Sequence, residues 1–265
     1  MSLFMLGYFS KKIHRKLVLF VFKVKRIVGN MYNTRLLDYS RNKLFIFTEN
    51  IREFETRARS CAKEPELIEW IERFPQLTIF YDIGANVGAY SLVAAVNSKK
   101  VFSFEPAFQN FFRLNSNVSL NHLDNVVTCF PVALSTHTKL GSFKYIETSA
   151  GSSKGFYNED AKFHLVENVE IEKQMLVFSL DDFIQEFNLP TPHMIKIDVD
   201  GGEMDVITGA RKTLTRSSLK SVLVEIDSTL NDVQALINLL ESAGLTLDGK
   251  FRRTDTISNY IFVRE

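Results

Sequence analysis

The chain of 265 residues is 45% hydrophobic and 24% charged, which fits one large globular domain and excludes a disordered protein. A net charge of +1 gives no case for a nucleic-acid partner. The only two cysteines, Cys61 and Cys129, are too few for a disulfide framework or a zinc site, and they predict a reducing, cytoplasmic location.

Residues 1–30 differ in charge from the rest of the chain. They contain seven Lys or Arg residues and no acidic residue, whereas the remainder has 25 basic and 31 acidic residues. Apolar residues recur there at helical spacing, but the longest apolar run, 17–22, is far shorter than the roughly 20 residues that span a membrane. We predict a basic amphipathic helix that lies on the inner face of a membrane, or else packs on its own domain or on the second subunit of a homodimer.

Residues 31–76 are expected to form an N-terminal cap region beside the main sheet. A short strand is predicted over 43–48, and a helix over 64–74 with Pro65 in its first turn. No catalytic motif lies in this region, and we expect it to cover part of the active site.

The stretch from 77 to 96 predicts a strand, a tight turn with glycines at 84 and 88, and a helix from 89. Glycine lets the backbone approach a ligand closely, and the helix N-terminus presents free N–H groups. The middle glycine of the dinucleotide fingerprint and the lysine of a P-loop are both missing. Asp82, two residues before the first glycine, would repel a pyrophosphate and suits a cationic ligand.

A second strand is predicted over 101–104, and Glu105 and Pro106 follow it. An acidic side chain at this place accepts hydrogen bonds from both hydroxyls of a ribose. A helix over 107–120 and a third strand over 126–131 come next. Loops at the carboxyl ends of such strands line a ligand crevice, so the backbone near Ala133 is a candidate contact for an adenine ring.

Residues 141–177 predict a β-rich insertion, with strands over 141–146 and 169–177 around a polar loop. We weigh two interpretations equally, a substrate-binding loop and a simple edge hairpin. A short helix is expected to begin at about residue 179.

Three carboxylates, Asp198, Asp200 and Glu203, follow a fourth predicted strand over 194–197. Like charges this close raise one another's pKa and need a reason. Three explanations of the cluster are considered: Mg or Ca binding, a general base for an acceptor hydroxyl, and compensation of the dipole of the next helix. We favour the helix dipole for Asp200 and function for Asp198. One continuous helix is predicted after Glu203, with apolar positions 204, 207, 210 and 214 on one face.

The C-terminal part predicts a fifth strand over 221–226 that carries Glu225, and an amphipathic helix from 233 to 244. Two further strands, over 245–247 and 259–263, have no helix between them. They therefore fit an antiparallel hairpin at the end of the sheet.

Four segments together resemble the FkbM family of methyltransferases. They are Asp-Ile-Gly-Ala-Asn-Val-Gly at 82–88, Phe-Glu-Pro at 104–106, Ser-Leu-Asp-Asp at 179–182 and Lys-Ile-Asp-Val-Asp-Gly-Gly-Glu at 196–203. The family usually has Glu-Gly-Ala-Glu where this chain has Asp-Gly-Gly-Glu. The resemblance covers about 79–226 and leaves the first 75 residues outside.

This resemblance implies the class I methyltransferase fold, an α/β domain over 77–265. Its sheet is doubly wound, Rossmann-like and mostly parallel, with seven strands and a C-terminal antiparallel hairpin, and here an N-terminal helical extension precedes it. The implied activity is S-adenosylmethionine-dependent O-methylation of a hydroxyl on a sugar of a surface glycan or on a natural product.

Site residues are carried over by position. Those expected to bind the cofactor are Asp82, Gly84, Ala85, Asn86, Gly88, Tyr90, Ser91, Glu105, Pro106, Ala133 and Asp198. The candidate catalytic acids are Asp198, Glu203 and Glu225. No metal ligand is assigned, although Mg remains open as a cofactor. The alternatives are an NAD(P)-dependent oxidoreductase with a related sheet, and a non-catalytic binding protein at the membrane periphery.

Overall fold

The computed structural model describes residues 34–74, 78–97, 100–145, 149–152, 155–156 and 171–264. The predicted helix over 1–30 and most of the polar loop of the insertion lie outside these ranges. In the part of the chain that is described, no helix is both long enough and apolar enough to cross a bilayer.

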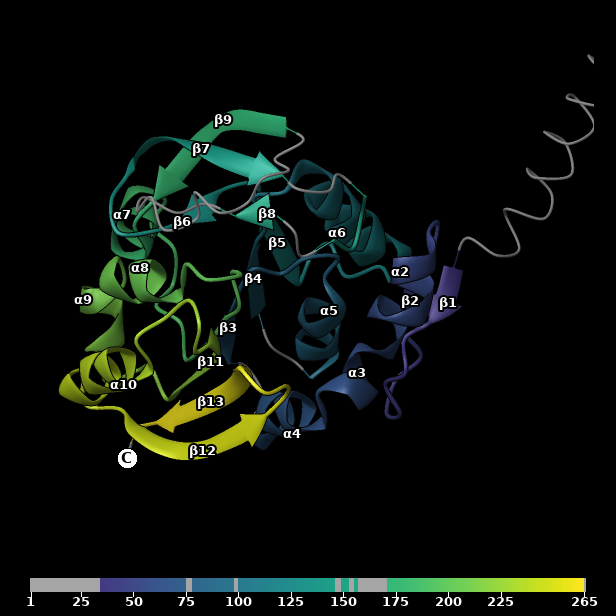
Figure 1. The fold of residues 1–265 in the computed structure, drawn as a ribbon. Coiled ribbons are helices and arrows are strands. Elements are labelled where there is room, and N and C mark those ends of the chain that lie inside the picture. The colour runs from purple at the N-terminus through teal and green to yellow at the C-terminus, as the bar shows by residue number, and fades with distance from the viewer. Residues whose placement is uncertain are drawn as a thin grey trace, which may run out of the picture.

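A seven-stranded sheet forms the centre of the molecule (Figure 1). From one edge to the other its strands are β12 (Thr246–Arg252), β13 (Ile257–Val263), β11 (Ser221–Asp227), β10 (Met194–Ile197), β3 (Ile79–Ile83), β4 (Lys100–Phe104) and β5 (Val127–Phe130). β13 pairs antiparallel with both β11 and β12, and the other neighbours pair in parallel. The predicted sheet and its closing hairpin are confirmed.

The central strands are apolar on both faces because each face supports its own core. In β3, Phe80 packs into one core, whereas its neighbours Tyr81 and Ile83 pack into the other. In β10, Met194 likewise packs into the first core and Ile195 into the second. This is the alternation of a pleated strand buried between two helical layers, and it explains why these strands appear in the sequence as unbroken apolar runs.

The helices cover the two faces as separate groups (Figure 1). One core includes α4 (Pro65–Arg73), α5 (Ala89–Val96) and α6 (Phe108–Leu120). The other includes α7 (Leu180–Glu186), α8 (Glu203–Thr208), α9 (Arg211–Leu214) and α10 (Val233–Ser242). The sheet is therefore doubly wound, as predicted.

The single helix predicted after Glu203 is wrong, because the structure divides it into α8 and α9. The break falls at Gly209, where a Cβ atom would lie 2.0 Å from the backbone oxygen of Ser135. This close approach of a distant loop requires a glycine, and no local periodicity reveals it.

The cap region packs on one face of the main sheet. It contains β1 (Thr34–Leu36), β2 (Phe45–Phe47), α2 (Ile51–Glu55), the 3₁₀ helix η1 (Arg57–Arg59), α3 (Ser60–Lys63) and α4. The predicted strand and the predicted helix with its N-terminal Pro65 are present as β2 and α4. Trp70 of α4 is buried, and its indole N–H donates to Ser221 Oγ of β11 at 2.8 Å. The cap and the sheet thus share one core.

The β-rich insertion contributes to a second, four-stranded sheet that lies beside the main one (Figure 1). Its strands are β6 (Ala133–Leu134), β9 (Ile171–Phe178), β7 (Lys139–Tyr145) and β8 (Gly155–Phe156), in that order across the sheet. β7 and β9 form a long antiparallel pair, and β6 adds to β9 in parallel. The insertion is therefore more than a two-stranded hairpin.

Candidate active site

A cavity of about 300 Å³ lies where four parallel strands, β3, β4, β10 and β11, end. Within the sheet, β4 and β5 lie on one side of β3, and β10 and β11 lie on its other side. The order of strands reverses at this point, and open α/β sheets bind their ligands in the crevice that results. The loops after β3, β4 and β10, the end of β11 and residues of the cap all line the cavity.

The turn after β3 forms part of the cavity wall through Gly84, Ala85 and Asn86. Gly84 has a φ of +76°, and a Cβ atom there would lie 1.7 Å from the backbone oxygen of Asp198. A side chain at this position would thus collide with the loop after β10. The glycine lets the turns after β3 and β10 meet, and this contact brings the predicted cofactor turn and the predicted acidic cluster together.

Glu105 follows β4 and is almost fully buried, although it lines the cavity. Its Oε2 accepts a hydrogen bond from the Asn86 backbone N–H at 2.7 Å, and its Oε1 accepts one from the Ala107 backbone N–H at 2.9 Å. Burial raises the pKa of Glu105 to about 7, and the two backbone donors oppose that rise. Each carboxylate oxygen keeps acceptor capacity for a further donor, so the group fits the two hydroxyls of a ribose.

A turn of the insertion, residues 149–152, closes another side of the cavity. Ser152 O accepts hydrogen bonds from the side-chain amides of Asn86 (3.0 Å) and Asn110 (2.9 Å). Asn110 Oδ1 also accepts from the Gly151 N–H, and Arg57 of the cap donates to Gly151 O at 2.9 and 2.6 Å. The insertion is therefore hydrogen-bonded to both the turn after β3 and the cap, and residues of the cap also line the cavity.

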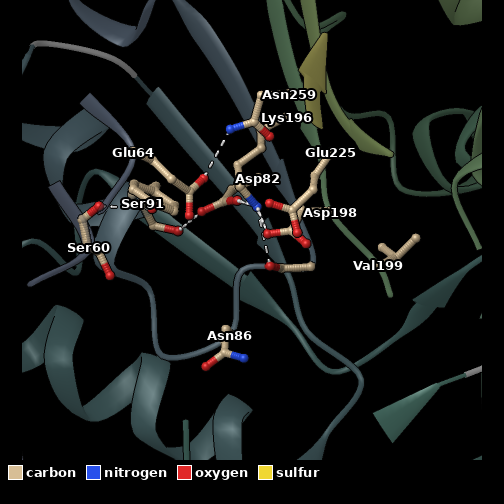
Figure 2. Close-up of polar contacts among 12 residues, drawn as sticks. Ser60, Glu64, Asp82, Asn86, Ser91, Lys196, Asp198, Val199, Glu225 and Asn259 are labelled. Atoms are coloured by element: carbon tan, nitrogen blue, oxygen red, sulfur yellow. Dashed lines mark hydrogen bonds and ion pairs between the residues drawn. The ribbon is translucent and has the colours of Figure 1, made fainter. Parts of the chain in front are cut away.

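Lys196 is a buried ammonium in the middle of an apolar strand. Figure 2 shows it between two carboxylates, with Nζ 3.4 Å from Asp82 Oδ1 and 3.2 Å from Asp198 Oδ2. Burial by itself would lower the pKa of Lys196, but the charges of Asp198 and Asp82 outweigh it and raise the pKa. The same ion pair lowers the pKa of Asp198 against the opposing effect of its burial. Asp198 is therefore held as a carboxylate at the cavity.

Glu225, at the end of β11, faces the cavity near Asp198 (Figure 2). Its Oε2 accepts a hydrogen bond from Arg253 at 2.7 Å. Burial raises the pKa of Glu225 to about 8, and the charges of Asp198 and Glu64 add to the rise. Glu225 thus differs from Asp198 in holding its proton near neutral pH.

The cavity brings together most of the predicted site residues. Those that line it are Gly84, Ala85, Asn86, Tyr90, Glu105, Pro106, Ala133, Asp198 and Glu225. Asp82, Gly88, Ser91 and Glu203 are not among the described residues that line it. Asp82 instead accepts a hydrogen bond from Ser91 Oγ at 2.5 Å, beneath the turn after β3. The Ser91 hydroxyl is also hydrogen-bonded to the hydroxyl of Ser103.

Glu203 has a supporting place behind the loop after β10. Its Oε1 accepts from the backbone N–H groups of Val199 and Gly201, and its Oε2 accepts from Asn231 at 2.8 Å. Burial raises the pKa of Glu203, and these donors oppose the rise. The side chain therefore shapes the loop that carries Asp198.

Several cavity residues lie outside the predicted set, among them Arg57, Glu64, Asn110, Lys196, Asp200 and Arg253. A signal existed for Lys196, because a charged residue inside an apolar strand needs a buried partner. None existed for Arg57, Glu64 and Arg253, which come from the cap and from the β12–β13 turn. Among the residues that are described, no group of three or more His, Cys, Asp or Glu side chains is arranged to hold a metal ion.

Comparison with known proteins agrees with this geometry. The chain matches the Methyltransferase FkbM domain over residues 82–247. It is 25% identical over 206 residues to the hexuronic acid methyltransferase AglP of Haloferax volcanii, and this alignment spans 76% of this chain and 78% of that protein. It is 27% identical over 187 residues to Methyltransferase 1 of Beauveria bassiana, which spans 66% of this chain and 74% of that protein.

Solved structures resemble the chain more distantly. The magnesium protoporphyrin IX methyltransferase of Synechocystis PCC 6803, with bound SAM, is 9% identical at a TM-score of 0.49, over 82% of this chain and 86% of that one. The family match, which spans more than half of the chain, favours the methyltransferase prediction over the oxidoreductase alternative. The chain belongs to the FkbM family of S-adenosylmethionine-dependent methyltransferases.

Proposed function

We propose that this methyltransferase transfers the methyl group of S-adenosylmethionine to a hydroxyl of a sugar in a glycan. The observation that carries the proposal is that one cavity is lined both by Glu105, which suits a ribose, and by two further carboxylates, Asp198 and Glu225. A binding protein without catalysis would not need these additional acids beside the cofactor site.

The cofactor would be held by residues that are already fixed in place. Glu105 would accept hydrogen bonds from the ribose hydroxyls, and the backbone of the turn at 84–86 would contact the methionine part of the cofactor. The carboxylate of Asp198 suits the positive charges of the methionine part. These groups are positioned by backbone contacts and by Lys196, so little reorganisation is needed on binding.

When bound, S-adenosylmethionine supplies a methyl group that is activated by a sulfonium charge. The protein's contribution is to hold the acceptor oxygen in line with that methyl group and to receive the hydroxyl proton. Glu225 and Asp198 both face the cavity and are the groups on hand for the proton. Glu203, the third predicted acid, would act indirectly by holding the loop of Asp198. A chelator tests directly whether the reaction uses Mg.

A uronic acid unit is the first acceptor to test, because one relative is named a hexuronic acid methyltransferase. The cavity is lined by cations as well as acids, including Arg57 and Lys63 of the cap, which could contact an anionic sugar. A neutral hexose oligosaccharide is the necessary comparison.

The test has two stages. Calorimetry with S-adenosylmethionine, with its demethylated product and with NAD establishes which cofactor binds. Transfer of labelled methyl groups to uronic and neutral oligosaccharides, with and without Mg and with EDTA, then identifies the acceptor, and Asp198→Asn serves as the impaired variant. Cofactor binding without transfer to any acceptor would favour the binding-protein alternative, and binding of NAD alone would refute the proposal.

The basic segment over 1–30 would suit an enzyme that acts on lipid-linked sugars at a membrane surface. Deletion of residues 1–28 should then reduce sedimentation with anionic vesicles and leave cofactor affinity unchanged. If binding to vesicles persists after deletion, the membrane role fails. A change from dimer to monomer on gel filtration would instead support a contact between subunits.

A further inference from the structure

One guanidinium nitrogen joins two carboxylates at the edge of the cavity. Arg253 Nη1 lies 2.7 Å from Glu225 Oε2 and 2.7 Å from Glu64 Oε1. The three side chains come from three separate parts of the chain: the end of β11, the junction of α3 and α4, and the turn between β12 and β13. All three residues line the cavity.

The partners of Glu225 are themselves held firmly. Arg253 is mostly buried, and its backbone N–H donates to Ile257 O at 2.9 Å, which fixes the turn that carries it. Glu64 is buried, and the side-chain amide of Asn259 on β13 lies 3.4 Å from its Oε2 (Figure 2). The hydrogen-bonded guanidinium therefore gives Glu225 one preferred orientation.

Charged groups from several elements act on the Glu225 carboxyl, and Asp200 of the loop after β10 also interacts with it electrostatically. Asp198 after β10 and Glu64 before α4 are acidic and favour its protonated form, whereas Arg253 and Lys196 are basic and favour its ionised form. Burial and the two acids prevail, so the pKa of Glu225 rises to about 8. A general base works best when its pKa is near the operating pH.

We propose that Arg253 and Glu64 are positioning residues for Glu225, and that Glu225 is the base that removes the proton of the acceptor hydroxyl. This inference rests on the proposed O-methylation. In the reaction the acceptor O–H bond breaks, and its proton moves to the Glu225 carboxylate. The oxygen forms a bond to the methyl carbon as the carbon–sulfur bond breaks, and that bond's electron pair remains on the sulfur.

The inference gives the cap region and the β12–β13 turn a part in catalysis. Both lie outside the range of 82–247 that matches the family, and neither Glu64 nor Arg253 belongs to a sequence motif. Asp198 has a different part, because its ion pair with Lys196 keeps it charged and makes it a weak proton acceptor.

The first test measures the Glu225 carboxyl directly and needs no acceptor. Carbon-13 NMR of the full chain with labelled glutamate, with Glu225→Gln to assign the signal, follows its titration. Arg253→Met should raise the pKa of Glu225 by about 1 pH unit, the lower end of the effect of an opposite charge within 6 Å, because the side chain is one-fifth exposed. Glu64→Gln should lower it.

Two neighbouring residues provide matched controls. Arg252→Met removes an exposed arginine next in the chain, which pairs with Asp255. Glu66→Gln removes another carboxylate that Asn259 contacts, at 2.8 Å. Both should leave the titration of Glu225 unchanged. Arg253→Lys keeps the charge and should stay near wild type, which separates electrostatics from misfolding. An unchanged Glu225 titration in folded Arg253→Met would overturn the positioning role.

The second test uses the acceptor that the wild-type enzyme methylates. The acidic limb of the kcat profile should move to higher pH in Arg253→Met and to lower pH in Glu64→Gln, in step with the NMR titrations. If wild type transfers methyl groups and the limb does not follow these titrations, Glu225 is not the base although the proposed function stands. If wild type binds the cofactor and methylates no sugar, the proposed function fails, and the basic role of Glu225 fails with it.

Discussion

Glu105→Ala should weaken binding of S-adenosylmethionine without unfolding the protein. In the wild type the carboxylate is held by two backbone N–H groups, at 2.7 Å from Asn86 and 2.9 Å from Ala107. The variant loses a charged acceptor for the ribose hydroxyls, which is worth ~1–3 kcal/mol for buried polar partners. That loss corresponds to a dissociation constant about 5 to 150 times larger.

Calorimetry at pH 8, where Glu105 is ionised, measures this effect, and the exposed Glu241→Ala on α10 is a suitable surface control. Because the pKa of Glu105 is about 7, wild-type affinity should also fall as the pH drops from 8 to 6. Glu105→Gln, which cannot ionise, should lack this pH dependence. An affinity of Glu105→Ala within twofold of wild type at pH 8 would refute the ribose contact.

Gly84→Ala should lower the free energy of unfolding by about 2–5 kcal/mol, the sum of the costs of a left-handed backbone and of an overpacked contact. In the control Gly249→Ala the new methyl group meets only the exposed ring of Phe251, so urea unfolding should show a loss under ~1 kcal/mol. Lys196→Met leaves two carboxylates without their counter-charge, so urea unfolding should show a loss of about 3–5 kcal/mol, and a loss under ~1 kcal/mol would contradict the buried ion pair. Since the folded-state pKa of Glu105 is raised above its unfolded value, its protonated form contributes stability below pH ~4.5 that is lost as the pH rises through 7. The stability of wild type relative to Glu105→Gln should therefore decline across that interval, and a constant difference would show that the carboxyl titrates normally.

The central strands and the carboxyl ends that carry function could be predicted from the sequence. Buried parallel strands appear as apolar runs, and the acids that follow them, such as Glu105 and Asp198, necessarily meet at one edge of the sheet. Elements of a few residues, such as β6 and α3, offer too little periodicity to be recognised.

The remaining features depend on contacts between distant segments. The break between α8 and α9 exists because Ser135 approaches Gly209, and the local pattern continues across it as one helix. Glu64 and Arg253 are separated by almost the whole domain in sequence, and only the fold brings them 2.7 Å apart. Their roles could not be predicted, because neither residue stands in a distinctive local pattern.

The position of β13 has a consequence for synthesis of the protein. This strand is an interior member of the sheet, between β11 and β12, although it is made after both of them. A chain emerging from the ribosome can pair β3, β4, β5, β10 and β11 in turn, but β11 keeps an open edge until residue 263 is available. The turn that carries Arg253 is fixed at the same moment. The active site is thus complete only after β13 has been made and inserted, and chains that stop before β13 expose a hydrophobic strand edge prone to aggregation.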